Sequence, residues 1–101
     1  LRVTMEPRGF QQIEAATLAS STALTIQTGT DGLIPDLCIV HPDTQNVRWR
    51  DDGVAPTASI GMRLLVGAEL IVDGPAAMKA VRFIVETAGA NLNVSYYRRA
   101  G

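Results

Sequence analysis

Residues 45–57 read QNVRWRDDGVAPT, and this stretch carries the clearest structural signal of the chain. Val47 and Trp49 alternate with Arg48 and Arg50, which is the period of two expected for a strand with one buried and one polar face. The Asp-Asp-Gly that follows predicts the turn that ends this strand. Trp49 is the only tryptophan. We expect it to pack in the core of the domain or to anchor a contact with another protein.

Other short strands are expected on both sides of this one, separated by turns rich in Gly, Pro and Asp. Residues 33–40 form an almost unbroken apolar run, which is typical of a strand covered on both faces. Pro35 cannot donate to a ladder, so the first half of this run is expected at an edge or bulge. Residues 81–86 and 92–97 both alternate, and we expect them to form an antiparallel hairpin. Further strands are expected at residues 10–13, 22–27, 47–51, 57–61, 63–66 and 69–73.

Helical signals are weak. Residues 14–19 contain helix-forming residues, but a Ser-Ser-Thr sequence follows directly, so we expect a strand or loop there. Residues 76–79 follow Pro75, which suits the first position of a helix, and we expect a single helical turn. No longer segment shows helical periodicity.

Seven to nine short strands predict an all-β fold, a small antiparallel β-sandwich or jelly-roll-like domain. With 101 residues the chain is long enough for one domain and too short for two. We expect residues 10–101 to form this single β-sandwich domain. Residues 1–9, which contain Pro7, are expected to form an N-terminal arm or an edge strand.

The charge of the chain argues against several classes of partner. The net charge is −1 and there is no basic stripe, so neither a nucleic acid nor an anionic membrane is an expected partner. No transmembrane helix and no secretory signal are expected, because no long apolar run and no charged segment before an apolar one are present. All basic residues except Lys79 are Arg. This indicates either contact surfaces, where Arg is enriched, or the codon bias of a GC-rich genome.

The residue types of a reaction site are scarce. Cys38 lies in an apolar stretch and is expected to be buried, and a strand would place His41 on the opposite face from it. Neither clustered His nor the spaced acids of a calcium loop are present. Paired carboxylates for glycoside cleavage stay open among the ten acidic residues, although nothing in the sequence isolates a pair. We therefore expect no enzymatic activity, no cofactor and no metal.

Charged side chains at two places in the chain are the candidate contact residues. A dense charged strand and turn without catalytic groups nearby is typical of a contact surface. Two further arginines, close to the end of the last strand, lie either at a solvated terminus or against a neighbouring subunit. The candidate interface residues are Arg48, Arg50, Asp51, Asp52, Arg98 and Arg99.

Two segments, NVRWRDDG at residues 46–53 and LNVSYY at residues 92–97, resemble a group of small proteins encoded in the structural regions of tailed bacteriophages and prophages. The resemblance covers roughly residues 22–97. It implies a virion component without enzymatic activity, assembled in the cytoplasm of the bacterial host. The first expectation is a capsid decoration (cement) protein that forms a homo-oligomer and binds the major capsid protein. The second is a neck, tail or fibre subunit that binds other virion proteins.

A carbohydrate-binding module for host attachment is the alternative from another class. Its stacking residues would be Trp49, Tyr96 and Tyr97. Aromatic residues make up only 5% of the chain, which is few for a platform that binds sugars.

Overall fold

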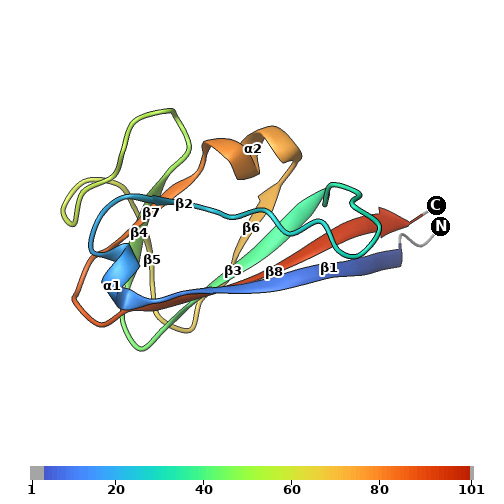
Figure 1. The fold of residues 1–101 in the computed structure, drawn as a ribbon. Helices are drawn as coiled ribbons and strands as arrows, with labels where there is room; N and C mark the ends of the chain where they lie inside the picture. Colours follow the sequence, from blue (N-terminus) through green and yellow to red (C-terminus); the bar gives the residue numbers. More distant parts are fainter. Residues whose placement is uncertain (1–3, 101) are drawn as a thin grey trace.

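The computed structural model describes residues 4–100, which form eight strands and two short helices (Figure 1). The strands are β1 (Thr4–Ile13), β2 (Thr22–Ala23), β3 (Leu37–Asp43), β4 (Val47–Arg50), β5 (Met62–Leu64), β6 (Leu70–Asp73), β7 (Arg82–Val85) and β8 (Asn91–Ala100), and the helices are α1 (Ala15–Leu18) and α2 (Pro75–Ala80). This confirms the prediction of a small all-β domain. None of the described helices is long and apolar enough to span a membrane.

The strands form two antiparallel four-stranded sheets. Sheet A has the order β1-β8-β3-β6, and sheet B has the order β2-β7-β4-β5. Four of the antiparallel pairs are nested inside one another along the chain, as in a single long hairpin: β1–β8, β2–β7, β3–β6 and β4–β5. Two further pairings, β3–β8 and β4–β7, roll this hairpin into two sheets. The eight-stranded rolled hairpin is a jelly roll.

The core lies between the two sheets and is closed by the helices. Alternate residues of each strand point inward, and these are the inner faces of the sheets. Two inner side chains, Tyr96 from sheet A and Phe83 from sheet B, are the largest that are fully buried. The helices contribute Leu18 and Met78, which are also buried. The other buried members of the cluster are Ile13, Cys38, Val40, Val47, Leu64, Val72, Val81, Ala90, Leu92 and Val94.

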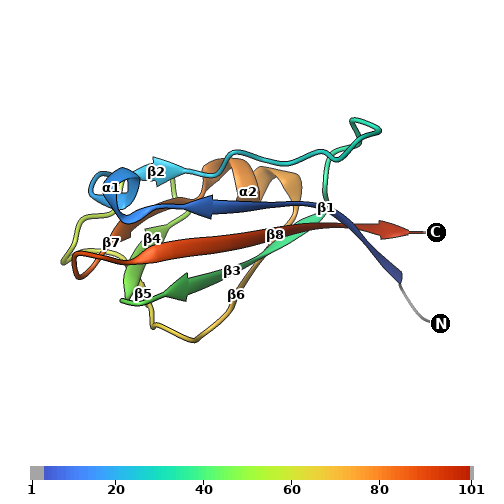
Figure 2. The same cartoon turned by 60° about the horizontal axis from the view of Figure 1, so that its bottom comes forward.

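Strand β1 forms one edge of sheet A and β6 forms the other. The segment expected as an arm or edge strand belongs, over residues 4–9, to β1 and pairs with β8; residues 1–3 lie outside the described residues. The register of β1 shifts between Pro7 and Gly9. Figure 2 shows β1, β8 and β3 side by side, with the described ends of β1 and β8 at the same end of the molecule. The predicted domain boundary at residue 10 therefore falls inside a continuous strand.

The predicted hairpin of residues 81–86 and 92–97 is wrong. The two strands exist as β7 and β8, but β7 lies in sheet B and β8 in sheet A. Five residues separate β7 from β8, and they carry the chain from one sheet to the other. Alternation shows that a segment is a strand with two different faces, but it does not show which strand lies beside it.

Three local predictions are also wrong. Residues 14–19 contain α1, and the strand expected at 22–27 is limited to β2. Beyond β2, the backbone N–H of Thr25 donates to the Gln11 side chain instead of a ladder. Residues 57–61 form a turn closed by a hydrogen bond from the N–H of Thr57 to the carbonyl of Ile60. Side-chain and turn hydrogen bonds compete with strand formation in these segments.

The apolar run at residues 33–40 also differs from its prediction. Strand β3 begins only at Leu37, after the buried Pro35. The inner face of β3 is covered by the core, whereas Ile39 on the outer face is only half-buried. The expectation that this strand is covered on both faces is therefore wrong for the chain taken alone. The helical turn expected after Pro75 is confirmed as α2.

Candidate contact surface

The β4–β5 hairpin carries a shallow groove of about 420 Å³ at the end of sheet B. On its inner face, Val47 and Leu64 pair and are buried in the core. The next pair on the same face is Trp49 and Met62, and Met62 is 61% exposed. The apolar inner face of sheet B therefore continues beyond the covered core into an open groove. The groove is lined by Trp49, Arg50, Asp51, Asp52, Ile60, Gly61 and Met62.

The turn after β4 places charged side chains on the rim of this groove. The Arg50 guanidinium donates to both carboxylate oxygens of Asp52, with a distance of 3.0 Å from Nε to Oδ1. Hydrogen bonding to Arg50 holds the pKa of Asp52 below its ordinary value. Asp51 is exposed and forms no ion pair among the described residues. The rim therefore offers a solvated carboxylate beside a neutralised Arg–Asp pair.

Arg48 lies on the outer face of sheet B and supports the groove from behind. Its Nε donates to the carbonyl of Ala58 at 3.0 Å, and its Nη1 donates to the carbonyl of Gly61 at 2.9 Å. Glu86 forms ion pairs with the Nε of Arg48 at 3.0 Å and with the Nε of Arg63 at 2.7 Å. The hydrogen bonds of Arg48 therefore fix the loop between β4 and β5 and give the groove its shape.

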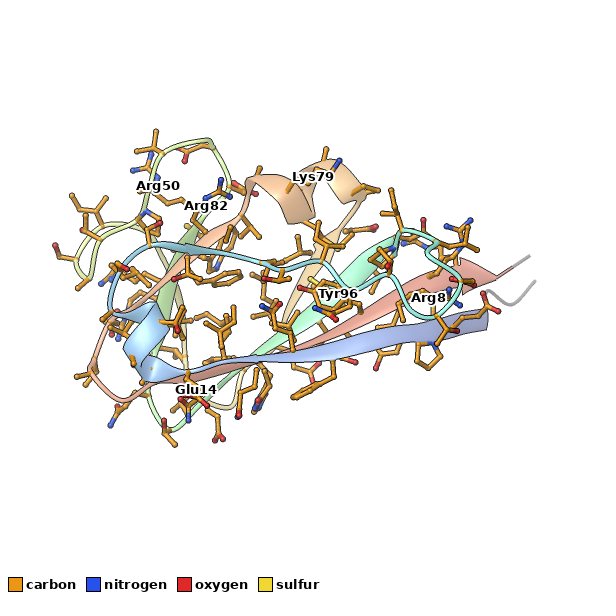
Figure 3. All side chains as sticks on the ribbon, in the orientation of Figure 1. Arg8, Glu14, Arg50, Lys79, Arg82 and Tyr96 are labelled. Carbon is orange, nitrogen blue, oxygen red and sulfur yellow. The ribbon has the colours of Figure 1, made fainter. Side chains whose placement is uncertain are left out.

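The outer face of sheet B gathers four arginines. The cross-strand register pairs Arg48 with Arg63 and Arg50 with Arg82, so all four project from the same face. Figure 3 shows Arg50 and Arg82 along the same side of the molecule as Lys79. We did not expect Arg63 and Arg82 at this surface. The alternation of residues 81–86 already showed that Arg82 lies on a polar face, but not that this face continues onto β4.

The other two candidate contact residues lie at the opposite end of the molecule, where β8 ends (Figure 1). The Nη1 of Arg98 donates to the carbonyl of Ile34 at 3.0 Å. Arg99 forms an ion pair with Asp73 at 3.1 Å, and its backbone N–H donates to Asp36 at 2.6 Å. These contacts join the end of β8 to β6 and to the segment before β3. The six candidate residues therefore form two separate groups, and only the group at residues 48–52 borders the groove.

The single cysteine and the single histidine of the chain lie away from this groove. Cys38 is fully buried in the core, and burial raises the pKa of its thiol to about 12. The prediction of a buried Cys38 is therefore confirmed. His41 projects from the outer face of β3, opposite to Cys38. Between residues 4 and 100, no group of three or more His, Cys, Asp or Glu side chains is arranged to hold a metal ion.

The three aromatic residues considered for sugar stacking do not form one platform. Tyr96 is fully buried in the core, and its hydroxyl donates to Gln11 at 2.8 Å. Tyr97 projects from the outer face of sheet A, whereas Trp49 belongs to sheet B. The prediction that Tyr96 stacks on a ligand is therefore wrong, and Trp49 alone of the three borders the groove.

Comparison of the chain with protein-family models, with curated proteins and with solved structures found no match.

Proposed function

We propose that this chain is a structural subunit of a tailed-bacteriophage or prophage particle, namely a head decoration protein that binds over junctions between major capsid subunits. The observation that carries this proposal is the open groove at Trp49. Its walls are apolar and exposed, with Ile60 59% and Met62 61% accessible, and its charged rim is largely neutralised by the Arg50–Asp52 pair. An exposed apolar patch with a polar rim is typical of a protein contact site.

The fold supports the same proposal by analogy. Jelly rolls of two four-stranded sheets recur in viral capsid proteins, although the same architecture also serves lectins and cupins. Cupin chemistry depends on a metal held by clustered side chains, and the described part of this chain has no such cluster. In this proposal an apolar side chain of the shell protein enters the groove between Trp49 and Met62. The exposed Asp51 then meets a basic group at the rim.

A sedimentation assay tests the proposal. Purified protein is mixed with undecorated heads of the phage or prophage that encodes it, and bound protein is measured after pelleting. We expect saturable binding with many copies per head. We also expect Ile60→Ser combined with Met62→Ser to weaken it at least tenfold, because both side chains are groove walls outside the core. Leu33→Ser is the matched control, since Leu33 is 45% exposed but far from the groove in the chain and outside its lining.

Two results would contradict the decoration proposal. A folded protein without affinity for heads eliminates it. Binding of only a few copies at one vertex, or recovery with tails, replaces it with a neck, tail or fibre subunit. Equal loss of binding in the groove variant and in the Leu33→Ser variant would show that the groove is not the contact site.

A glycan-binding module for host attachment is a second candidate, favoured by one observation. Trp49 borders the groove beside Arg50 and Asp51, and an indole ring next to planar hydrogen-bonding groups suits the stacking of a sugar ring. Glycan-array binding that is lost in Asp51→Ala, with an unchanged circular dichroism spectrum, would favour this candidate. Binding to heads but to no glycan would exclude this candidate and support the decoration protein.

A further inference from the structure

Three of the six aspartates of this chain are followed directly by glycine, namely Asp31, Asp52 and Asp73. An Asp-Gly bond is a place where a protein chain rearranges readily without an enzyme, because glycine has no side chain to shield its main-chain nitrogen. The three carboxyl side chains are 46%, 52% and 60% exposed, so water reaches each of them. A Cβ on the glycine that follows would meet nothing within 4 Å at any of the three sites. The surroundings therefore leave room for the rearrangement.

The rearrangement passes through a cyclic imide. The main-chain nitrogen of the glycine attacks Cγ of the protonated carboxyl group, and the carboxyl hydroxyl leaves as water together with the proton of that nitrogen. Water then opens the ring at either carbonyl. Opening at Cγ restores aspartate, whereas opening at the main-chain carbonyl leaves isoaspartate, in which the chain runs through the side-chain carbonyl and is longer by one methylene. The reaction therefore requires a protonated carboxyl group and a Cγ that can reach the glycine nitrogen.

Each of these three carboxylates is paired with an arginine. The pairs are Arg8–Asp31, Arg50–Asp52 and Arg99–Asp73. Both oxygens of Asp52 accept hydrogen bonds from Arg50, and both oxygens of Asp73 accept from the Nη2 of Arg99, at 3.1 and 3.2 Å. The three aspartates that precede another residue type form no ion pair between residues 4 and 100. Ion pairing of an aspartate therefore coincides with a glycine at the next position.

An arginine on the carboxylate opposes both requirements of the rearrangement. Hydrogen bonding to the arginine favours the ionised form, and it holds the pKa of Asp31 and of Asp52 below the ordinary value. A guanidinium bound to both oxygens also fixes the plane of the carboxylate, so Cγ does not turn toward the glycine nitrogen. Exposed ion pairs contribute little to the stability of a fold. The same pairs can nevertheless slow a reaction that needs the carboxyl group to be neutral and free.

We propose that Asp31-Gly32 and Asp52-Gly53 are sites of spontaneous isoaspartate formation, and that Arg8 and Arg50 restrain this modification in the folded chain. The inference goes beyond the proposed function, because it concerns the chemical lifetime of the chain and not its partner. At Asp52 the rearrangement would insert a methylene into the turn that lines the groove. The Arg50–Asp52 pair therefore preserves the shape of the groove rim as the protein ages.

The third site, Asp73-Gly74, carries a second restraint. The main-chain N–H of Gly74 donates to the carbonyl of Asp36 at 2.7 Å, so the nitrogen that would attack is already engaged. Asp73 is also the last residue of β6, and its backbone lies in the ladder with β3. The glycines of the other two sites form no such backbone hydrogen bond between residues 4 and 100. Loss of Arg99 is therefore expected to have a smaller effect than loss of either of the other two arginines.

Ageing of the purified chain at about pH 5 tests the proposal, because an exposed Asp carboxyl of ordinary pKa is then protonated in less than about a tenth of the molecules. Mass spectrometry with electron-transfer fragmentation locates and quantifies isoaspartate in each peptide. We expect Arg50→Gln to form isoaspartate at Asp52 about two- to fivefold faster than the parent, the factor by which an exposed ion pair biases a conformation. Arg63→Gln is the matched control, because it removes an arginine of the same sheet whose partner is Glu86.

The outcomes distinguish restraint by the ion pair from a general loosening of the fold. Faster isomerisation of Asp52 in Arg50→Gln, with an unchanged circular dichroism spectrum and with the parent rate in Arg63→Gln, supports the inference. A parent rate at Asp52 in Arg50→Gln, or an equal rise in Arg63→Gln, overturns it. In concentrated urea the ion pair is absent, so the parent and Arg50→Gln are expected to react at the same rate. A difference that persists in the unfolded chain overturns the inference as well, because it would come from the local sequence alone.

Discussion

At the scale of single residues, Tyr96 connects β8 to β1 through the core. Its ring is fully buried, and its hydroxyl donates to the Oε1 of Gln11 at 2.8 Å. The same oxygen accepts a second hydrogen bond from the backbone N–H of Thr25 at 3.2 Å. Burial raises the pKa of the Tyr96 hydroxyl, so this group donates its proton throughout the ordinary pH range.

We expect Tyr96→Phe to lower the free energy of unfolding by about 1 kcal/mol. The substitution removes one hydrogen bond but leaves Gln11 bonded to Thr25, so no buried acceptor becomes unpaired. Urea denaturation, followed by the fluorescence of Trp49, measures the change. Tyr97→Phe is the matched control, because no hydrogen bond of the Tyr97 hydroxyl is seen among residues 4–100. Equal changes in the two variants would contradict the role assigned to the Tyr96 hydroxyl.

Some single residues were predictable because their own chemistry decides their place. Cys38 sits among apolar neighbours in a strand, and burial followed from that alone. The surroundings of Gly53 and Gly61 were harder to predict, because a sequence indicates a turn but not which atoms lie around it. Tyr96 was harder to place, because a tyrosine suits the core as well as a surface, and the alternative of a carbohydrate-binding module counts it among its stacking residues. Only the position of Gln11 across the sheet shows that the Tyr96 hydroxyl has a partner inside.

At the scale of elements, Glu86 joins three strands of sheet B. Its carboxylate accepts hydrogen bonds from Arg63 at 2.7 and 2.8 Å and forms an ion pair with Arg48 at 3.0 Å. Its backbone N–H donates to the carbonyl of Asn46 at 3.0 Å. The hydrogen bonds from Arg63, with a further contribution from Asn46, hold the pKa of Glu86 below its ordinary value of 4.5.

The lowered pKa of Glu86 predicts a pH dependence of stability. A carboxylate with a lowered pKa in the folded state contributes its full stabilisation above the ordinary value and loses it as the pH falls through the folded value. We therefore expect Glu86→Gln to reduce the loss of stability between about pH 5 and about pH 3, as measured by thermal unfolding at each pH. Glu69→Gln, at an exposed carboxylate before β6, is the control. A Glu86→Gln profile parallel to that of the parent would contradict the prediction.

The entry to β5 depends on Gly61. Its φ of 147° and the φ of 84° at Gly53 both lie where side chains are disfavoured. A Cβ at Gly61 would also lie 3.2 Å from the carbonyl oxygen of Trp49 and 3.2 Å from Pro56, whereas a Cβ at Gly53 meets nothing within 4 Å. We expect Gly53→Ala to cost about 1 kcal/mol and Gly61→Ala about 2–4 kcal/mol, because overpacking adds to the strain. Urea denaturation measures both, and equal costs would contradict the crowding at Gly61.

Strands were predictable at this scale, and their partners were not. The alternation of residues 47–50, 70–73 and 82–85 identified β4, β6 and β7 because one face of each strand is buried. The hairpin expected from β7 and β8 failed because neighbours in a jelly roll usually lie in different sheets. The groove had a sequence signal in residues 49–52, but its second wall comes from residues 60–62, where no strand alternation marks the surface.

At the scale of the whole molecule, the rolled hairpin pairs β1 with β8, the two strands that lie farthest apart in the sequence. Thr4 pairs with Ala100 and Ile13 with Leu92. The described ends of the chain therefore lie side by side at one end of the molecule (Figure 1). All-β domains with such non-local pairing fold slowly, typically in milliseconds to seconds. The chain loses the entropy of a long loop before the stabilising contacts between its ends can form.

A circular permutant tests whether β1–β8 pairing limits folding. The ends are joined by a short Gly–Ser linker, and the chain is opened between Gly29 and Thr30, which are both exposed. This shortens the loop between β1 and β8 about fivefold, which lowers the entropic cost of closing that loop by about 1.4 kcal/mol. The sequence separations of the pairs β3–β6 and β4–β5 do not change. We expect refolding up to about tenfold faster, with a nearly unchanged unfolding rate. Stopped-flow fluorescence of Trp49 measures both rates against the linear chain carrying the same linker. An unchanged folding rate would show that β1 joins β8 only after the rate-limiting step.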